Sequence, residues 1–324
     1  MSSKPYLVST ASDKKYGDFL IEHWYASLKD NVDLKKIDLL VLDYGLSKSQ
    51  KFYLEKNKVK VYPCIRDGHV VNLRFRDLLD FLNKHKYKQI LTCDGGDIIF
   101  QADISHLFEE HREEYRAVCE DLAPFFEFFI TKDYFYEEDI KELKEILLFK
   151  KMINAGLVLA PYEKMKFLCK TLIEKTKDKY KFGPDQILIN YVLHKYGFIE
   201  LPTKYNFIPV TSLDPFILKD GFFYDQNQNK IPVVHNAGNL NFFRAIENFG
   251  YGNGYNILKE DILKALRTLY NSLHLVNKPK KDIILLSKKI EEFIRSTTKF
   301  DLSQSYEVQK KYLESFLKFI DRKK

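Results

Sequence analysis

The amino-acid sequence predicts an α/β fold built on a mostly parallel sheet that helices cover on both faces. Short apolar runs alternate with stretches of helical pattern along the first half of the 324-residue chain. One of these runs, DLLVL at residues 38–42, is apolar almost throughout, which is typical of a strand buried on both faces. Strands that alternate with helices of this length form a mostly parallel sheet.

The elements can be placed in order along the chain. Strands are expected at residues 5–9, 38–42, 59–62 and 89–93, and helices at residues 16–28, 47–56 and 76–85. A charged helix at residues 137–149, a strand at 156–160 and helices at 163–175 and 185–194 follow. Because ligands of such sheets bind at the carboxyl ends of the strands, we expect the functional residues there.

A change in composition beyond Tyr255 divides the chain into a main α/β domain at residues 1–255 and a basic helical extension at residues 256–324. Residues 257–324 hold sixteen Lys and Arg against nine Asp and Glu, which accounts for the whole net charge of +7. Apolar stripes at helical spacing run through this extension. Such stripes pack onto the main domain or a partner subunit of an oligomer, or they lie on an anionic membrane. Both interpretations stay open.

Composition excludes several classes of protein. Residues 1–256 carry no net charge, so they lack the basic stripe of a nucleic-acid-binding protein. The four cysteines are far apart, as expected of free thiols in a reducing compartment. The N-terminus lacks the apolar region of a secretory signal, and no run has the roughly 18 apolar residues of a membrane span. We therefore expect a cytoplasmic protein with no nucleic-acid partner.

Two aspartates flank a pair of glycines directly after the strand predicted at residues 89–93. Side chains three positions apart on a regular strand point to opposite faces, so Asp94 and Asp97 converge only if the chain turns between them. Gly95 and Gly96 permit such a turn. Carboxylate oxygens suit Mg²⁺ or Mn²⁺, which commonly bridge a protein to substrate phosphates. A solvated acidic turn is the alternative interpretation.

A histidine stands at the end of another predicted strand. His235 follows two β-branched residues, Val233 and Val234, and precedes Gly238. Neutral imidazole binds Mn²⁺-type ions well and Mg²⁺ poorly, so His235 at the same site would shift the preference toward manganese. A histidine with a purely structural role is the alternative.

Two further polar segments adjoin apolar elements. The first, Asn154-Ala155-Gly156, is expected to form a small turn before a buried strand. The second, Asp185-Gln186, follows Pro184 at an expected helix start, where a carboxylate is favoured by the helix dipole. Helix capping alone would explain Asp185. Several polar turns beside apolar strands are nevertheless what a sugar-binding crevice requires.

The order of these segments resembles the GT-A glycosyltransferases, and most closely glycosyltransferase family 8 and its relatives. The similarity lies in the strand ending in an acidic motif (LTCDGGDIIF), the Asn154–Gly156 strand, the Asp185-Gln186 helix start and the His-x-x-Gly segment at His235. It covers roughly residues 5–255. It implies a GT-A fold and a glycosyltransferase that moves a sugar from a nucleotide-sugar donor, such as a UDP-sugar, to a glycan, lipid-linked or other hydroxyl acceptor, with retention of configuration.

The resemblance also assigns roles to individual residues. It implies that Asp94, Asp97 and His235 bind a divalent metal, Mn²⁺ or Mg²⁺, and that Asp185 and Gln186 act on the sugar. The donor-binding residues that it implies are Thr10, Asp13, Tyr16, Arg76, Asp94, Gly95, Gly96, Asn154, Ala155, Gly156 and Gly238.

The chain departs from the family pattern at two places. Its acidic motif is DxxD, one residue longer than DxD, so which aspartate binds the metal directly stays open. Asp97 aligns best with the family motif, and the alternative for Asp94 is a contact with the ribose or, through water, with the metal. Where the family has a lysine that contacts the diphosphate, this chain has Asn241, and Arg244 is the nearest cation. We therefore expect Arg244 to bind the donor diphosphate.

Other classes of function predict different residues or different behaviour. A nucleotidyltransferase would carry a Gly-rich phosphate loop with Arg or Lys after its first strand, where this chain has TASDKKY. A phosphatase with an Asp-x-Asp nucleophile would need Thr or Val after that motif, which CDGGDII lacks. A non-catalytic module would bind a nucleotide-sugar or carbohydrate without turnover.

Overall fold

The computed structural model describes residues 4–121, 126, 129–148, 150–209, 211, 212, 214–237 and 246. The predicted boundary at residue 255 and the whole basic extension lie outside the described residues. Gly238 and Arg244, two of the expected donor-binding residues, lie outside them as well.

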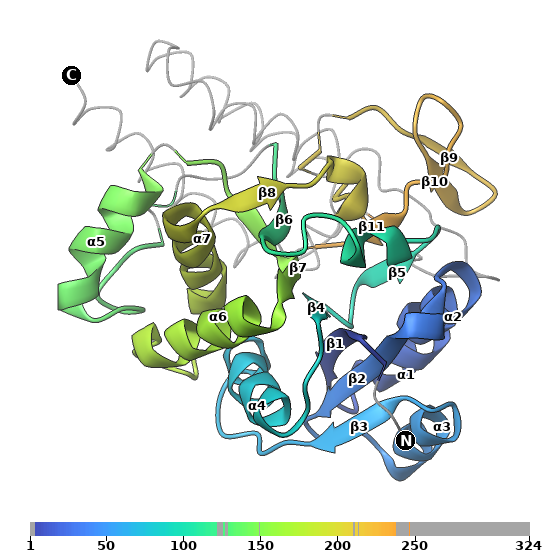
Figure 1. The fold of residues 1–324 in the computed structure, drawn as a ribbon, viewed down its shortest axis with the longest axis horizontal. Coiled ribbons are helices and arrows are strands. Elements are labelled where there is room, and N and C mark those ends of the chain that lie inside the picture. Colours follow the sequence, from blue (N-terminus) through green and yellow to red (C-terminus); the bar gives the residue numbers. More distant parts are fainter. Residues whose placement is uncertain are drawn as a thin grey trace, which may run out of the picture.

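A seven-stranded mixed sheet forms the centre of the described chain, in the order β3-β2-β1-β4-β7-β6-β8 (Figure 1). Its first four strands are parallel, β1 (Tyr6–Ser12), β2 (Ile37–Asp43), β3 (Lys60–Pro63) and β4 (Gln89–Cys93). Strand β7 (Ile153–Pro161) is antiparallel to both β4 and β6 (Tyr115–Cys119), and β8 (Phe198–Glu200) is parallel to β6. The predicted mostly parallel sheet is confirmed.

Both faces of the sheet are buried, which explains the continuous apolar runs. In β1, Tyr6 and Val8 belong to one core cluster and Leu7 to the other, because successive side chains of a strand point to opposite faces. Helices α4 (Val70–Lys84), α5 (Glu137–Leu147), α6 (Tyr162–Lys175) and α7 (Pro184–Tyr196) contribute to the cluster of Leu7. The other cluster includes residues of the continuous helical stretch α1 (Gly17–Phe19), η1 (Leu20–Tyr25) and α2 (Ala26–Asn31), and of α3 (Lys48–Lys56). Figure 1 shows α4, α6 and α7 gathered on one side of the strands.

Short elements complete the described chain. Strand β5 (Ile98–Phe100) pairs antiparallel with β11 (Val233–His235), and β9 (Ile217–Lys219) pairs antiparallel with β10 (Phe222–Tyr224). Three 3-10 turns are η2 (Leu34–Lys36), η3 (Ser105–Phe108) and η5 (Thr203–Tyr205). The β5–β11 pair matters most for function, because it joins the end of the acidic motif to the predicted metal-binding histidine.

Two local expectations were wrong. Helix α4 begins at Val70 instead of residue 76, because His69 caps it through Nδ1 and is itself held by a backbone hydrogen bond to Lys179 O. Residues 154–156 lie inside β7 and do not form a turn before it. Their polar strand end is stable there because Asn190 on α7 bonds both the N–H and the C=O of Ile153.

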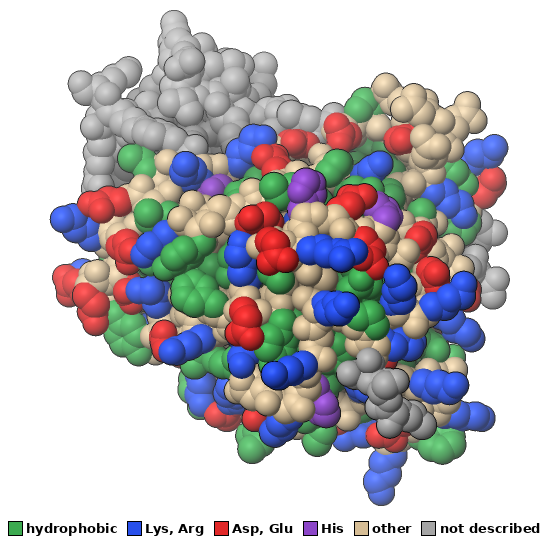
Figure 2. All heavy atoms as spheres, in the orientation of Figure 1, with side chains coloured by type: hydrophobic (Ala, Val, Ile, Leu, Met, Phe, Trp, Pro, Cys, Tyr) green, Lys and Arg blue, Asp and Glu red, His purple; other side chains and the backbone are tan. Residues whose placement is uncertain are grey.

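The surface of the described chain carries mixed charge. Figure 2 shows acidic and basic side chains interspersed over the face that it presents. None of the helices among the described residues is both long enough and apolar enough to cross a membrane. All four cysteines are free thiols.

Replacing Arg116 tests the packing of the sheet against η3. This side chain is 1% exposed, and it donates hydrogen bonds to Leu107 O, Glu110 O and Gln89 Oε1. We expect Arg116→Met to lower the free energy of unfolding by at least about 2 kcal/mol, since buried acceptors lose their donor. The exposed Arg112 is the matched control, and Arg112→Met should change it by less than about 1 kcal/mol. Equal losses in urea unfolding of the two variants would contradict this account.

Candidate functional site

The acidic motif forms a turn at the carboxyl end of β4. Its first residue is tied to β7 by a hydrogen bond from Asp94 N to Gly156 O (2.9 Å). A Cβ on Gly95 would lie 2.4 Å from Thr10 Oγ1, and one on Gly96 would lie 3.1 Å from the Tyr16 ring. The turn is therefore packed closely against the end of β1 and the segment after it, and a side chain at Gly95 would force Thr10 to move.

His235 lies beside this turn because of the β5–β11 ladder. The ladder pairs His235 with Ile98, the residue after Asp97, and Asn236 N donates to Asp97 O (2.8 Å). The imidazole Nε2 is 3.4 Å from Asp97 Oδ1 and 3.7 Å from Asp94 Oδ2. Potential ligand atoms of the three side chains all lie within 4.8 Å of one another. The structure thus brings together the three residues that were expected to share one metal ion.

The electrostatics of the cluster suit a cation. His235 is 2% exposed, and burial by itself lowers the pKa of an imidazole. The carboxylates of Asp97 and Asp94 oppose this effect, and the net shift raises the pKa of His235 above its usual value. The site therefore favours a positive charge between Nε2 of the imidazole and the carboxylate oxygens of Asp94 and Asp97. That donor set fits Mn²⁺ and related divalent ions.

A buried arginine connects the acidic turn to α7. The guanidinium of Arg74 on α4 donates from Nη1 to Asp94 Oδ1, and from Nη2 to Asp185 Oδ2 at 3.2 Å and Ala155 O at 3.4 Å. Asp185 is 5% exposed in the first turn of α7. Burial raises the pKa of its carboxyl to about 6, with Arg74 opposing the shift and Asp94 adding to it. At pH 7 this carboxylate is ionised and held in place by Arg74.

Arg76, the arginine expected from the sequence, is not brought to this cluster. It lies about 200° around α4 from Arg74. Its guanidinium contacts the carboxylates of Asp67 and Asp77 and the carbonyl of Ile65. Sequence reasoning missed Arg74, although a signal exists. Arg74 falls in the apolar stripe of α4 with Leu78 and Phe81, where an arginine is buried only if it is paired.

The remaining residues around β7 shape the pocket for His235. A Cβ on Gly156 would lie 2.3 Å from Cε1 of His235, so a glycine is required there. Asn154 Oδ1 accepts a hydrogen bond from Gly156 N (2.9 Å). Both ends of the Gln186 amide are used by β7, since Oε1 accepts from Ala155 N and Nε2 donates to Ile153 O. Gln186 therefore positions the strand, and its expected contact with a sugar stays a prediction.

Two of the expected donor-binding residues, Thr10 and Tyr16, lie against the acidic turn. Thr10, at 2% exposure, is packed against Gly95. Asp13 accepts hydrogen bonds from the backbone of Lys15 and Tyr16 and pairs with Arg66 (2.7 Å). The ring of Tyr16 is 37% exposed and adjoins Gly96. A partly exposed tyrosine ring, with Lys15 Nζ over it at 4.9 Å, thus lies next to the turn that carries Asp94 and Asp97.

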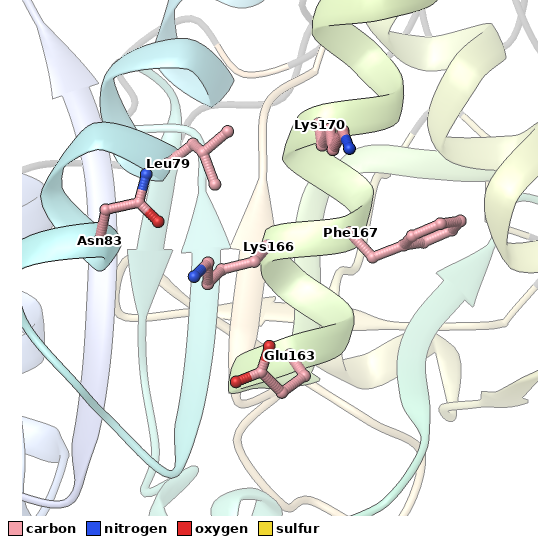
Figure 3. A pocket seen from close by; sticks show the side chains of 6 residues that line it. All are labelled: Leu79, Asn83, Glu163, Lys166, Phe167 and Lys170. Atoms are coloured by element: carbon pink, nitrogen blue, oxygen red, sulfur yellow. The ribbon is translucent and has the colours of Figure 1, made fainter.

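A separate hollow of about 340 Å³ lies between α4 and α6. Figure 3 shows the side chains that line it projecting from these two helices, Leu79, Asn83, Glu163, Lys166, Phe167 and Lys170. Asn83 is near the end of α4 and Glu163 near the start of α6, which places the hollow toward the amino end of β4. The metal-ligand cluster is at the opposite end of that strand.

Comparisons with known proteins bear on the fold. No family model and no curated protein matches the sequence. The structure is similar to that of WbbM, described as a bifunctional glycosyltransferase, with 16% identity and a TM-score of 0.50, over 74% of this chain and 46% of that one. The predicted fold is confirmed. This chain spans about half the length of WbbM.

Two structures of LgtC also match, each at 16% identity. One is an active-site mutant, with a TM-score of 0.46 over 72% of this chain and 87% of that chain. The other is galactosyltransferase LgtC in complex with donor and acceptor sugar analogues, with a TM-score of 0.47 over 86% of this chain and 99% of that chain. The likeness of fold rests on WbbM, and at 16% identity it extends to the fold alone.

A double-mutant cycle tests the close approach of Gly156 and His235. The methyl group of Gly156→Ala must displace the imidazole, and we expect a loss of about 1–3 kcal/mol in the free energy of unfolding. In the His235→Ala background the clash with the imidazole is gone and only the contact with Asn154 Oδ1 (2.8 Å) remains, so the same change should cost less. Urea unfolding of the four proteins measures the coupling. Additive losses would show that the two residues are not in contact.

Proposed function

We propose that the protein is a metal-dependent glycosyltransferase that moves a sugar from a nucleotide-sugar donor to a hydroxyl acceptor on a glycan or lipid. The observation that carries this proposal is the convergence of Asp94, Asp97 and His235 at the carboxyl end of β4. The site lies where ligands of α/β sheets bind. The fold, shared with a glycosyltransferase, supports the same proposal.

The metal in this proposal is Mn²⁺, with Mg²⁺ as the second choice, because one of the three ligands is an imidazole nitrogen. Asp94, Asp97 and His235 would hold it. When bound, such an ion supplies Lewis-acid stabilisation of the negative charge on a departing nucleoside diphosphate. Gly238 and Arg244 remain predicted contacts of that diphosphate.

Asp185 is the residue that we propose acts on the sugar. Its carboxylate is buried, ionised at neutral pH and oriented by Arg74, which also contacts Asp94. A fixed carboxylate of this kind stabilises positive charge that develops on a sugar ring as the glycosidic bond to the donor phosphate breaks. This role agrees with a retaining reaction. Arg74 takes the place in the site that was expected of Arg76.

The nucleoside end of the donor is proposed to lie along Thr10, Asp13 and Tyr16, with UDP as the favoured nucleotide. The exposed ring of Tyr16 offers a face on which a base can stack. Free thiols support a cytoplasmic location. Peripheral membrane contact and oligomerisation through the basic extension stay predictions.

Turnover of UDP-sugars measured with and without Mn²⁺ tests the proposal. Chelation should abolish release of UDP, and Asp97→Asn should lower kcat at least about 100-fold because metal-dependent stabilisation of the transition state is lost. Asp185→Asn should lower kcat to a similar degree while leaving donor affinity nearly unchanged. Asp103, whose carboxylate accepts hydrogen bonds from the N–H and the hydroxyl of Ser105, provides the matched control, and Asp103→Asn should keep full turnover.

Two other outcomes would contradict the proposal in different ways. Metal-dependent binding of the donor without turnover, in the presence of a broad set of acceptors and of water, would identify a non-catalytic binding module. Turnover that is insensitive to chelation and to Asp97→Asn would overturn the metal site.

A further inference from the structure

A chain of buried amides runs from the backbone of β7 to His235, and it begins at Asn154. Oδ1 of this side chain accepts a hydrogen bond from Gly156 N at 2.9 Å. A backbone N–H can only donate, so the atom facing it must be the amide oxygen. The amide nitrogen then points the other way and donates to Glu120 Oε1 at 2.8 Å. The orientation of the Asn154 amide is therefore fixed from both ends.

Asn206 continues the chain to the imidazole. Its Nδ2 donates to Asn154 Oδ1 at 2.9 Å, which leaves its Oδ1 facing Nδ1 of His235, also at 2.9 Å. Asn206 is 1% exposed, so no solvent competes for these contacts. An amide oxygen can only accept a hydrogen bond. The proton of a neutral His235 imidazole must therefore be on Nδ1, and the lone pair on Nε2.

The backbone holds Asn206 in this place. Phe207, the next residue, receives a hydrogen bond on its oxygen from His235 N (2.8 Å) and donates one to Val233 O (3.0 Å). These backbone hydrogen bonds hold the segment after η5 against β11, the strand that contains His235. Backbone register therefore places Asn206 beside His235, and the hydrogen bond to Asn154 orients its side chain.

We propose that Asn206 is a positioning residue for the metal: supported by Asn154, it fixes His235 in the Nδ1–H tautomer and directs the Nε2 lone pair at the cation that Asp94 and Asp97 share. The other tautomer would place an N–H at Nε2, 3.4 Å from Asp97 Oδ1. That N–H would bond the carboxylate and close the site to an ion. Partners that fix the tautomer of a ligand histidine commonly change metal affinity 10–100-fold. The inference rests on the proposed metal site.

The test separates the tautomer from activity. Metal-free protein with ¹⁵N-labelled histidines is examined by long-range ¹H–¹⁵N NMR at pH 9, with His235→Gln identifying the signals of this residue. We expect the Nδ1–H tautomer in the natural protein and in Asn206→Asp, whose carboxyl group still accepts from Nδ1. Asn206→Leu keeps similar volume without an acceptor, and it should show the Nε2–H tautomer.

Mn²⁺ affinity of the same proteins is measured by electron paramagnetic resonance of the free ion. Asn206→Leu should bind Mn²⁺ about 10–100-fold more weakly, while Asn206→Asp should be restored toward the natural protein. Both variants lose the hydrogen bond donated to Asn154, so a purely structural role would weaken Mn²⁺ binding in both equally and would overturn the proposal.

The remaining outcomes distinguish this inference from the proposed function. An Nε2–H tautomer in the natural protein would overturn the role of Asn206 even if no variant folds. Equal Mn²⁺ affinity of the natural protein and Asn206→Leu would overturn it while leaving the glycosyltransferase proposal intact. A natural protein with the Nδ1–H tautomer that binds no Mn²⁺ would overturn the proposed metal site, and with it the metal role of Asn206.

Discussion

Negative charge concentrated at the carboxyl end of β4 is the constraint on which the rest of the site depends. Three carboxylates, of Asp94, Asp97 and Asp185, gather there, and the guanidinium of Arg74 contacts two of them. The field of this cluster raises the pKa of the buried His235, and burial raises that of Asp185. Desolvated carboxylates are costly unless they are paired, and Arg74 is one partner for this charge. In the proposed function, a divalent cation would be the other.

The fold supplies the rigidity that this charge requires. Gly95 and Gly96 let the turn pack directly on Thr10 and Tyr16, and Gly156 leaves room for the imidazole. The β5–β11 ladder fixes His235 beside Asp97. Hydrogen bonds to β7 and to Asn236 also hold the two ends of the acidic turn in place. This is the arrangement that preorganised stabilisation of a transition state demands.

The sequence identified the three candidate metal ligands but not the residues that orient them. Asp94 and Asp97 could be identified because the Gly-Gly pair between them predicts a turn. His235 could be identified because it follows two β-branched residues at the end of a predicted strand. Arg74 was missed because the helix was predicted to begin only at residue 76, although the spacing of Arg74 from Leu78 and Phe81 places it in the buried stripe of α4. Asn206 lies outside any periodic pattern, and only the register of its segment against β11 reveals it. Gln186 was predicted to contact the sugar, but its side-chain amide forms hydrogen bonds with the backbone of β7. The GT-A type of fold followed from element order, whereas these contacts depend on tertiary packing.

The central claim is that Asp94, Asp97 and His235 share one divalent ion that also binds a nucleoside diphosphate. Anomalous diffraction from crystals grown with Mn²⁺ and UDP tests it most directly, because manganese scatters anomalously and carbon, nitrogen and oxygen do not. We expect one peak within about 2.0–2.3 Å of His235 Nε2 and of a carboxylate oxygen, with diphosphate oxygens completing the coordination. A peak away from these side chains, or bound UDP with His235 hydrogen-bonded directly to Asp97 and no ion between them, would contradict the account.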